Sequence, residues 1–448
     1  REVFKTPTMK SSIIWGITFV VIVSGLTPML ETKWEFSLSK GIGFSIIALS
    51  MVLLTGYAGE INLAPLAFAG IGALSAYQFD VGSTVETGAG FATLATALAL
   101  LFAFLVLSAF GFKRRKLWML SVSIALLTLL LVTIFDGTTG TGIASRESLS
   151  ISALLVATLV SGITGALVAL PALRLRGLYL GLATFAFAIF VDKMVYKQRQ
   201  TLSLDIPFIG DGEDITFNIF NNGALNMPRP EFLSINFKNN QSAMLILLAI
   251  CFTLIALLLV QLKRSSYGRQ LSAMKDSPAA SATLGLNMLR LKLSVFTLAA
   301  AIAGFGGALH ASNLRAIQED APFTVFEGLG LFMLTVVGGI GYVSGALIGG
   351  ILYGTAFIVM GDFWAKLATD WNSFNWLFTF LHDFFLFLGP AVAGIGLGRN
   401  PNGIAAQIFD GFRVLGKRES RRILAIMVII IISVWLLRVS EVKDGWTF

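Results

Sequence analysis

The sequence predicts an all-α fold, a polytopic transmembrane helical bundle of about 11–13 helices with one broken or re-entrant segment, in a single domain over residues 1–448. Three observations predict this class. Hydrophobic residues make up 56% of the chain and charged residues 13%, and the mean hydropathy of +0.80 excludes a soluble globular enzyme. Apolar runs of membrane-spanning length recur along the whole chain. The 45 glycines favour helices that approach closely, because lipid provides no hydrophobic drive for helix association.

The apolar runs fall into two groups that flank a long polar stretch. The first group lies at residues 13–30, 42–54, 91–112, 117–135, 154–170 and 178–191. The second lies at residues 243–262, 293–311, 329–339, 346–360, 376–394 and 423–437. Residues 56–77 are interrupted by Gly and Pro, which predicts a broken helix followed by a span. The chain opens at Arg1 rather than Met, which leaves two alternatives open: Arg1 is the native start, or the sequence is a fragment, for example of a fused protein.

Basic clusters predict the orientation of the chain in the plasma (inner) membrane. They lie at residues 113–116, 174–176, 263–292 and 417–422 and alternate with mixed or acidic loops, so we expect them on the cytoplasmic side. The polar stretch 197–241 then forms an external loop, which carries Asp205, Asp211, Glu213, Asp214 and Glu231. The net charge of +8 therefore reflects topology, and we expect no nucleic-acid partner.

Residues that could carry catalysis or bind a metal are few. The one cysteine, Cys251, lies inside an apolar run, so we expect no internal disulfide and no thiolate metal site. With only His310 and His382, the chain has no multi-histidine cluster and no Ser-His-Asp grouping. The closest nucleotide motif, residues 411–418, has Arg418 where a magnesium-binding hydroxyl is required. We expect no cofactor, no metal and no enzymatic activity.

Polar residues within apolar surroundings are costly and therefore informative. Glu60 and Asn62 lie in the Gly-flanked break, where they line a path or cap a helix end. We favour a translocation path or gate, because a broken helix exposes backbone groups that need water, substrate or protein partners. Glu327 is expected to complement the dipole at a helix start. His382 and Asp383 point in different directions on one helix, which favours a structural role over a proton relay.

Glycines recur at a spacing of four residues late in the chain. Gly341, Gly345 and Gly349 form one series, and Gly350 with Gly354 forms a second. This spacing favours close packing between two helices. The alternative is a pair of ridges that slide as two halves of a dimer rock.

Residues 265–292 (SSYGRQLSAMKDSPAASATLGLNMLRLK) are too polar to cross lipid but have helical spacing. Leu271, Met274, Ala282 and Leu286 can face one way, which predicts a cytoplasmic helix-turn-helix. A plain connecting loop is equally compatible with the pattern alone.

The same segment resembles the coupling segment of ATP-binding-cassette importer permeases, and more closely that of the branched-chain amino acid LivM family. The resemblance is carried by Gly268, Arg269, Ala273, Lys275, Asp276, Ala280 and residues 285–287. Three further stretches carry it in the family's order, at residues 55–73, 173–188 and 326–350. Together they cover residues 41–403, whereas residues 88–148 and the C-terminal span and tail at 421–448 look like additions.

The resemblance implies a permease subunit of an ATP-driven, binding-protein-dependent importer of branched-chain amino acids or related small polar substrates, working by alternating access. It implies as partners ATP-binding-cassette ATPase subunits, a second, LivH-like permease and an extracytoplasmic substrate-binding protein, within the lipid bilayer. It implies that the ATPase docks on Gly268, Arg269, Ala273, Lys275, Asp276, Ala279, Ala280 and Gly285 in the coupling segment at 263–292. Gly285 can end a helix in a left-handed conformation. Two alternatives remain: an ion-coupled secondary transporter that uses Glu60 or Asp383, and a polytopic membrane enzyme.

Overall fold

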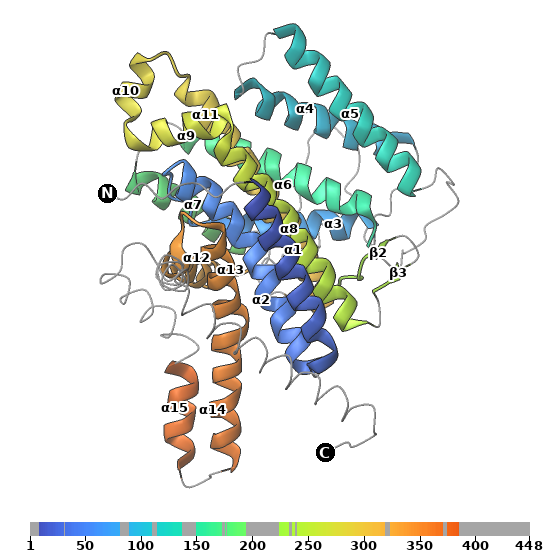
Figure 1. The fold of residues 1–448 in the computed structure, drawn as a ribbon, viewed down its shortest axis with the longest axis vertical. Helices are drawn as coiled ribbons and strands as arrows, with labels where there is room; N and C mark the ends of the chain where they lie inside the picture. The colour runs from blue at the N-terminus through green and yellow to red at the C-terminus, as the bar shows by residue number, and fades with distance from the viewer. Residues whose placement is uncertain are drawn as a thin grey trace, which may run out of the picture.

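The computed structural model describes residues 9–30, 32–80, 89–109, 114–136, 149–172, 175, 177–193, 224–232, 235–237, 240–318, 323–370 and 374–384. In this part of the chain the structure is a helical bundle, and strands are limited to four short segments (Figure 1). The predicted all-α class is therefore confirmed. The acidic residues at 205–214, the motif at 411–418 and the C-terminal segment at 421–448 lie outside the described residues.

The first half of the chain forms α1 (Met9–Leu26), η1 (Thr27–Met29), α2 (Thr32–Met51), the π-helix η2 (Val52–Tyr57), α3 (Pro65–Asp80), α4 (Ala89–Ala109), α5 (Arg114–Asp136), α6 (Ile151–Ala172) and α7 (Leu178–Val191). The second half forms α8 (Gln241–Arg264), α9 (Ser266–Asp276), α10 (Pro278–Thr283), α11 (Met288–Leu314), α12 (Val325–Gly339), α13 (Val343–Ile351), the π-helix η4 (Leu352–Phe357), α14 (Ile358–Asp370) and α15 (Asn375–Asp383). By length and composition, five helices of the described residues can cross a membrane: α1, α2 continued by η2, α6, α8 and α11.

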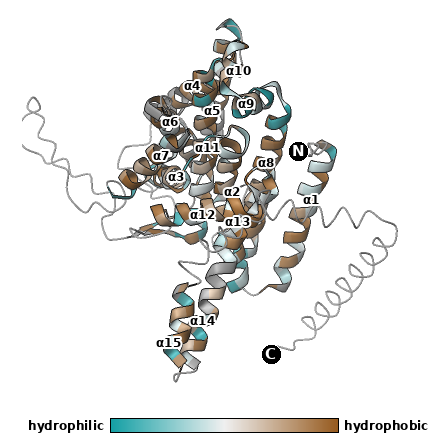
Figure 2. Cartoon of the chain, turned by 90° about the vertical axis from the view of Figure 1, so that its left-hand side faces the viewer, coloured by the Kyte–Doolittle hydropathy of each residue, from teal (hydrophilic) through white to brown (hydrophobic). Residues whose placement is uncertain are grey.

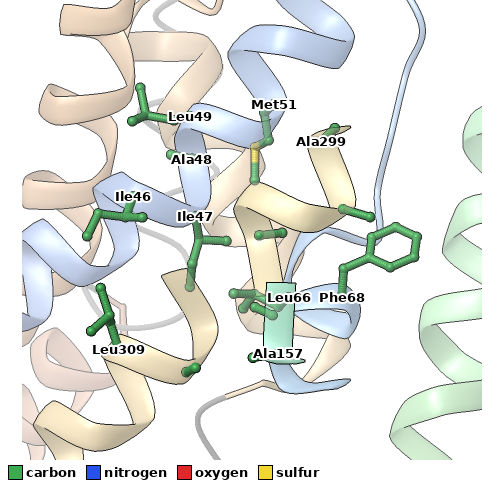
Figure 3. Close-up of a cluster of buried hydrophobic side chains, with 14 of the residues drawn as sticks. Ile46, Ile47, Ala48, Leu49, Met51, Leu66, Phe68, Ala157, Ala299 and Leu309 are labelled. Carbon is green, nitrogen blue, oxygen red and sulfur yellow. The ribbon is translucent and has the colours of Figure 1, made fainter. Parts of the chain in front are cut away.

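The long helix α11 forms the centre of the bundle, where it packs against α2, α3 and α6 (Figure 3). Glycine permits this packing. A Cβ atom on Gly72 would lie 2.4 Å from the Cα atom of Gly304, and one on Gly307 would lie 2.0 Å from the carbonyl oxygen of Ala69. The buried Ser161 hydroxyl adds polar contacts, since its Oγ lies 2.8 Å from the carbonyl oxygen of Ala300 on α11. The prediction that glycine allows close helix approach is confirmed.

The two ends of α11 carry different structures (Figure 1). At its start lie α9 and α10, which precede it in the chain. At its end β4 (Ala316–Gln318) pairs antiparallel with β1 (Ala224–Asn226), with Leu225 opposite Ile317. The strands β2 (Glu231–Phe232) and β3 (Ile235–Asn236) form a hairpin nearby. The described part of the predicted external loop and the predicted coupling segment therefore lie at opposite ends of the bundle.

The late helices differ from the predicted spans at their boundaries. The expected run 346–360 is the middle of a continuous helical stretch from α13 through η4 to α14. The paired helices α14 and α15 project from the bundle (Figure 1). Their side chains include exposed aromatic residues and charged residues, so a periodicity search for apolar runs ends before the helix does.

Candidate functional site

Three elements meet at the predicted cytoplasmic end of the bundle. They are the helix pair α9–α10, the break at residues 56–64 that runs from the last residues of η2 to the start of α3, and the turn between α12 and α13. Hydrophilic residues gather at the end of the molecule that carries α9 and α10 (Figure 2).

Side-chain caps define the helix pair. Ser265 Oγ accepts a hydrogen bond from the backbone N–H of Gly268 at the start of α9, at 3.3 Å. Ser277 Oγ accepts one from the N–H of Ala280 at the start of α10, also at 3.3 Å, and Pro278 occupies the first turn. Each cap satisfies a donor that the first helical turn leaves free. The predicted helix-turn-helix is therefore confirmed.

Gly285 ends α10 in the left-handed conformation that the sequence predicted, with φ +82°. The N–H of Leu286 donates to the carbonyl of Ser281 at 3.1 Å, and the N–H of Gly285 donates to the carbonyl of Ala282 at 3.0 Å. These two bonds form a Schellman motif. A Cβ atom on Gly285 would have no neighbour within 4 Å, so this position faces open space.

One face of α9 anchors the pair to the bundle. Tyr267, Leu271 and Met274 are each at most 1% exposed. The Tyr267 hydroxyl lies 2.6 Å from Ser294 Oγ on α11, and burial raises the pKa of Tyr267, so the phenol stays protonated. Four residues, Leu271, Met274, Ala282 and Leu286, were predicted to face one way. Leu271 and Met274 are buried and Leu286 packs against the core, but Ala282 is exposed, so this prediction is wrong there. The reason is that Ser277 starts a new helix, in which Ser281 takes the buried position.

The outer face of the pair is open. Six of the eight predicted docking residues are exposed: Arg269, Lys275, Asp276, Ala279, Ala280 and Gly285. Leu284 is 82% exposed and Leu289 57%, which adds apolar surface beside the small residues. The other two are less accessible: Ala273 is half-buried and Gly268 is buried. The backbone of Gly268 lies so close to the turn that an added Cβ atom would be 2.3 Å from the carbonyl oxygen of Lys263. Gly268 therefore serves the turn between α8 and α9.

The charged end of Lys275 points into the bundle although much of the residue is exposed. Its Nζ donates to the carbonyl oxygen of Gly56 at 2.7 Å. Its stem covers Gly59, where a Cβ atom would lie 2.7 Å from Lys275 Cγ and where φ is +74°. Sequence reasoning placed Lys275 on the docking face and could not detect this contact.

The break between η2 and α3 satisfies backbone donors within the protein. The N–H of Glu60 donates to the carbonyl of Leu54 at 3.2 Å, and the N–H of Leu63 donates to Thr184 Oγ1 of α7 at 3.0 Å. Asn62 Oδ1 accepts from the N–H of Ala64 at 3.0 Å. Irregular backbone is tolerated at membrane depth when it has such partners.

The Glu60 carboxylate forms an ion pair that joins the break to α11. Lys292 Nζ lies 2.6 Å from Glu60 Oε1, and these side chains are 14% and 11% exposed. Sequence reasoning selected Glu60 but missed Lys292. The sequence does contain a signal for this partner. A carboxylate near the membrane edge needs a nearby cation, and Lys292 is the last residue of the basic cluster at 263–292.

The turn between α12 and α13 completes the site. A Cβ atom on Gly56 would lie 2.2 Å from the carbonyl oxygen of Ile340, so break and turn are in close contact. Gly345 and Gly349 pack α13 against α12 of the same chain, with added Cβ atoms 2.1 Å from the carbonyl oxygen of Gly339 and 2.6 Å from Thr335 Cα. Gly341 has nothing within 4 Å of an added Cβ atom.

Other predicted polar residues lie elsewhere. Glu327 stands in the first turn of α12, where Thr324 Oγ1 accepts from its N–H at 3.4 Å, so the predicted helix-start position is confirmed. His382 lies in the last turn of α15 and Asp383 ends that helix. Among the described residues, no group of three or more His, Cys, Asp or Glu could hold a metal ion.

A buried polar network fastens the opposite end of the bundle. Arg229, which is 6% exposed, donates to Gln241 Oε1 and, at 3.2 Å, to the carbonyl of Phe237. Gln241 Nε2 donates to Ser39 Oγ of α2 at 2.8 Å and to Asn313 Oδ1 of α11 at 3.1 Å. Burial, with a smaller effect of the nearby Arg315 charge, lowers the pKa of Arg229 to about 10. The guanidinium therefore stays charged at neutral pH and holds the loop to Gln241 of α8, which in turn binds α2 and α11.

The chain is similar to known transport proteins. Residues 138–388 match the family described as "Branched-chain amino acid transport system / permease component". Two proteins named "High-affinity branched-chain amino acid transport system permease protein LivM", from Salmonella typhimurium (strain LT2) and Escherichia coli (strain K12), are each 27% identical to the chain over 205 residues. These matches cover 41% of this chain and 44% of each relative, so the chain spans less than half the length of these relatives. No solved structure matches the chain.

Proposed function

Because the chain belongs to the family of branched-chain amino acid transport system permease components, we propose that it is the transmembrane permease subunit of an ATP-driven importer in the plasma (inner) membrane. Its substrates are branched-chain amino acids or related small polar molecules. An extracytoplasmic binding protein selects and delivers them, so the permease itself needs only weak affinity. A second, LivH-like permease and two ATP-binding-cassette ATPase subunits complete the assembly.

One observation carries this proposal. The pair α9–α10 presents an exposed face of small residues, including Ala279, Ala280 and Gly285, while Tyr267 and Leu271 anchor its other face in the bundle. Small side chains leave room for a groove of a partner to close around the helix pair. A firmly anchored element is also suited to transmit a rigid-body movement. A passive connecting loop requires neither the caps nor the anchor.

Transport follows by alternating access. Closure of the ATPase subunits moves α9–α10, and the bond between Tyr267 and Ser294 carries that movement to α11. Because α11 packs against α2, α3 and α6, its movement then shifts these three helices together. Glu60 and Asn62 lie at the cytoplasmic end of the path, and the external loop receives the binding protein at the other end.

The test is co-purification of an ATPase subunit with the chain and with its Gly285→Leu variant. A leucine there strains a left-handed backbone by about 1 kcal/mol and projects from the docking face, so we expect normal insertion but loss of ATPase and of uptake. Gly177→Leu is the matched control, because Gly177 also has a positive φ, +56°, and no neighbour within 4 Å of an added Cβ atom, but lies outside the coupling segment.

Normal ATPase association and uptake in the Gly285→Leu variant would contradict the docking role. Equal loss in both glycine variants would show backbone strain rather than docking. Uptake driven by a pH gradient without any ATPase would instead support the ion-coupled transporter.

A further inference from the structure

We propose that Lys275 and Lys292 are positioning residues that join the coupling segment to the break at residues 56–64, and that this break is the cytoplasmic gate of the transport path. We call Lys275, Lys292, Gly56 and Glu60 the gate junction. The inference rests on the proposed importer function and adds the route by which movement at the ATPase reaches the path.

The first tie is the bond from Lys275 to the end of the α2–η2 helix. Gly56 lies in the last turn of η2, where carbonyl groups lack partners further along the helix. The Lys275 ammonium satisfies the Gly56 carbonyl at 2.7 Å and places a positive charge at the negative end of the helix dipole. A second cation, Lys263 of α8, lies 4.6 Å from the centre of the Tyr57 ring.

Gly59 makes the first tie close. Its backbone lies directly under the Lys275 stem, since an added Cβ atom would be 2.7 Å from Lys275 Cγ and 3.3 Å from Lys275 Cβ. Its φ of +74° also favours glycine. The Lys275 stem of α9 therefore packs directly on the backbone of the break.

The second tie is the ion pair between Lys292 and Glu60. Lys292 lies in the first turns of α11, directly after the α9–α10 pair. Its ammonium is 2.6 Å from Glu60 Oε1, and both side chains are at most 14% exposed. Separating this pair would leave two poorly hydrated charges without partners, which is strongly unfavourable. The break therefore follows α11 rather than detaching from it.

The coupling segment therefore contacts the break at two points, one on each side of α10. Lys275 arrives from α9, before the α10 corner, and Lys292 arrives from α11, after it. The break in turn contacts Ile340 in the turn between α12 and α13, and binds Thr184 of α7 through the N–H of Leu63. A displacement of α9–α10 must displace residues 56–64, and these residues contact α7 and the turn between α12 and α13.

Lys275→Met tests the first tie, because methionine keeps an apolar stem over Gly59 and removes the charge. The complete transporter with binding protein is reconstituted, and co-purified ATPase, ATP turnover and amino acid uptake are measured. We expect unchanged ATPase association but about tenfold less uptake per ATP hydrolysed. This fold-change corresponds to about 1.4 kcal/mol, near the lower limit of what one hydrogen bond to a charged group contributes. Lys366→Met, an exposed lysine of α14, is the control and should leave the ratio unchanged.

Charge exchange tests the second tie. Glu60→Lys and Lys292→Glu should each lower uptake per ATP by about tenfold or more, since each leaves two like charges in contact. The double variant Glu60→Lys with Lys292→Glu restores the pair and should recover most of the ratio. A correctly folded double variant no better than the poorer single variant would overturn the role of this pair.

The outcomes also separate this inference from the importer function itself. If no ATPase co-purifies with the unchanged chain, the importer function fails. If ATPase associates but Lys275→Met keeps normal uptake per ATP, the gate junction fails and the importer function stands. If Lys275→Met loses ATPase in proportion to uptake, Lys275 is a docking contact, which also overturns the inference. Should the exchanged pair not fold, the Lys275→Met result decides.

Discussion

The buried hydroxyl of Tyr267 binds α9 to α11. Ser294 Oγ donates to the carbonyl of Leu291 at 2.9 Å, so the Tyr267 hydroxyl is the donor in the bond to Ser294. Tyr267→Phe removes this bond but leaves Ser294 a partner. We therefore expect the free energy of unfolding, measured by denaturant titration in detergent, to fall by about 1 kcal/mol.

The matched control is Tyr179→Phe, whose side chain is 70% exposed and should show no change. Because burial raises the pKa of Tyr267, the folded state favours the protonated phenol. The stability that the protonated hydroxyl contributes is fully present below the pKa of an unfolded tyrosine, about 10, and is lost as the pH rises from there through the folded pKa. The effect of Tyr267→Phe on the free energy of unfolding should therefore be constant between about pH 6 and pH 9. Equal effects of both substitutions would contradict the role of this bond.

Alanine substitutions at Gly345 and Gly341 should have different effects on stability, although the two glycines are only four residues apart. A methyl group on Gly345 would lie 2.1 Å from the Gly339 carbonyl oxygen, whereas one on Gly341 would meet nothing within 4 Å. We expect Gly345→Ala to lower stability by about 1–3 kcal/mol, as overpacking does, and to lower the yield of folded protein. Gly341→Ala should leave the yield and thermal midpoint unchanged. Full yield of Gly345→Ala with loss of transport would favour a sliding ridge instead.

At the scale of elements, the sequence identified the helix pair but not its orientation. The caps at Ser265 and Ser277 and the helix end at Gly285 are local signals, because they depend on residues within one turn. The prediction that Ala282 faces the same way as Leu271 and Met274 was wrong, because a new helix with a different buried face starts at Ser277. The inward direction of Lys275 and the partner Lys292 could not be predicted, because both depend on contacts with residues more than 200 positions away in the chain.

The loop at the opposite end depends on one glutamine. Gln241 binds Arg229, Ser39 and Asn313 at once. Gln241→Leu leaves the buried Arg229 charge short of an acceptor, so we expect a loss of about 1–3 kcal/mol in the free energy of unfolding. Faster proteolysis of residues 224–240 should accompany it.

Gln261→Leu is the control for this substitution, because Gln261 is an exposed residue of the same helix, α8. It should change neither the unfolding curve nor the rate of cleavage. Unchanged proteolysis in the Gln241→Leu variant would show that the network does not hold the loop.

At the scale of the whole molecule, α11 runs between the two ends of the bundle at which we propose that partners bind. The helix pair α9–α10 lies at its start and the strand pair β1–β4 at its end. The all-α class was predictable because hydropathy depends on composition alone, whereas the central place of α11 depends on which glycines meet, such as Gly72 and Gly304. This architecture suits the proposed movement, which enters at the predicted cytoplasmic end and opens a path toward the predicted external loop.

Uptake of labelled leucine into proteoliposomes tests the account most directly. The vesicles contain this chain, a second permease and the ATPase subunits, with loaded binding protein outside and ATP inside. We expect accumulation that requires ATP, the ATPase and the binding protein together, and no accumulation when this chain alone is given an imposed pH gradient. Accumulation by the chain alone under that gradient, with no added effect of ATP and ATPase, would contradict the account.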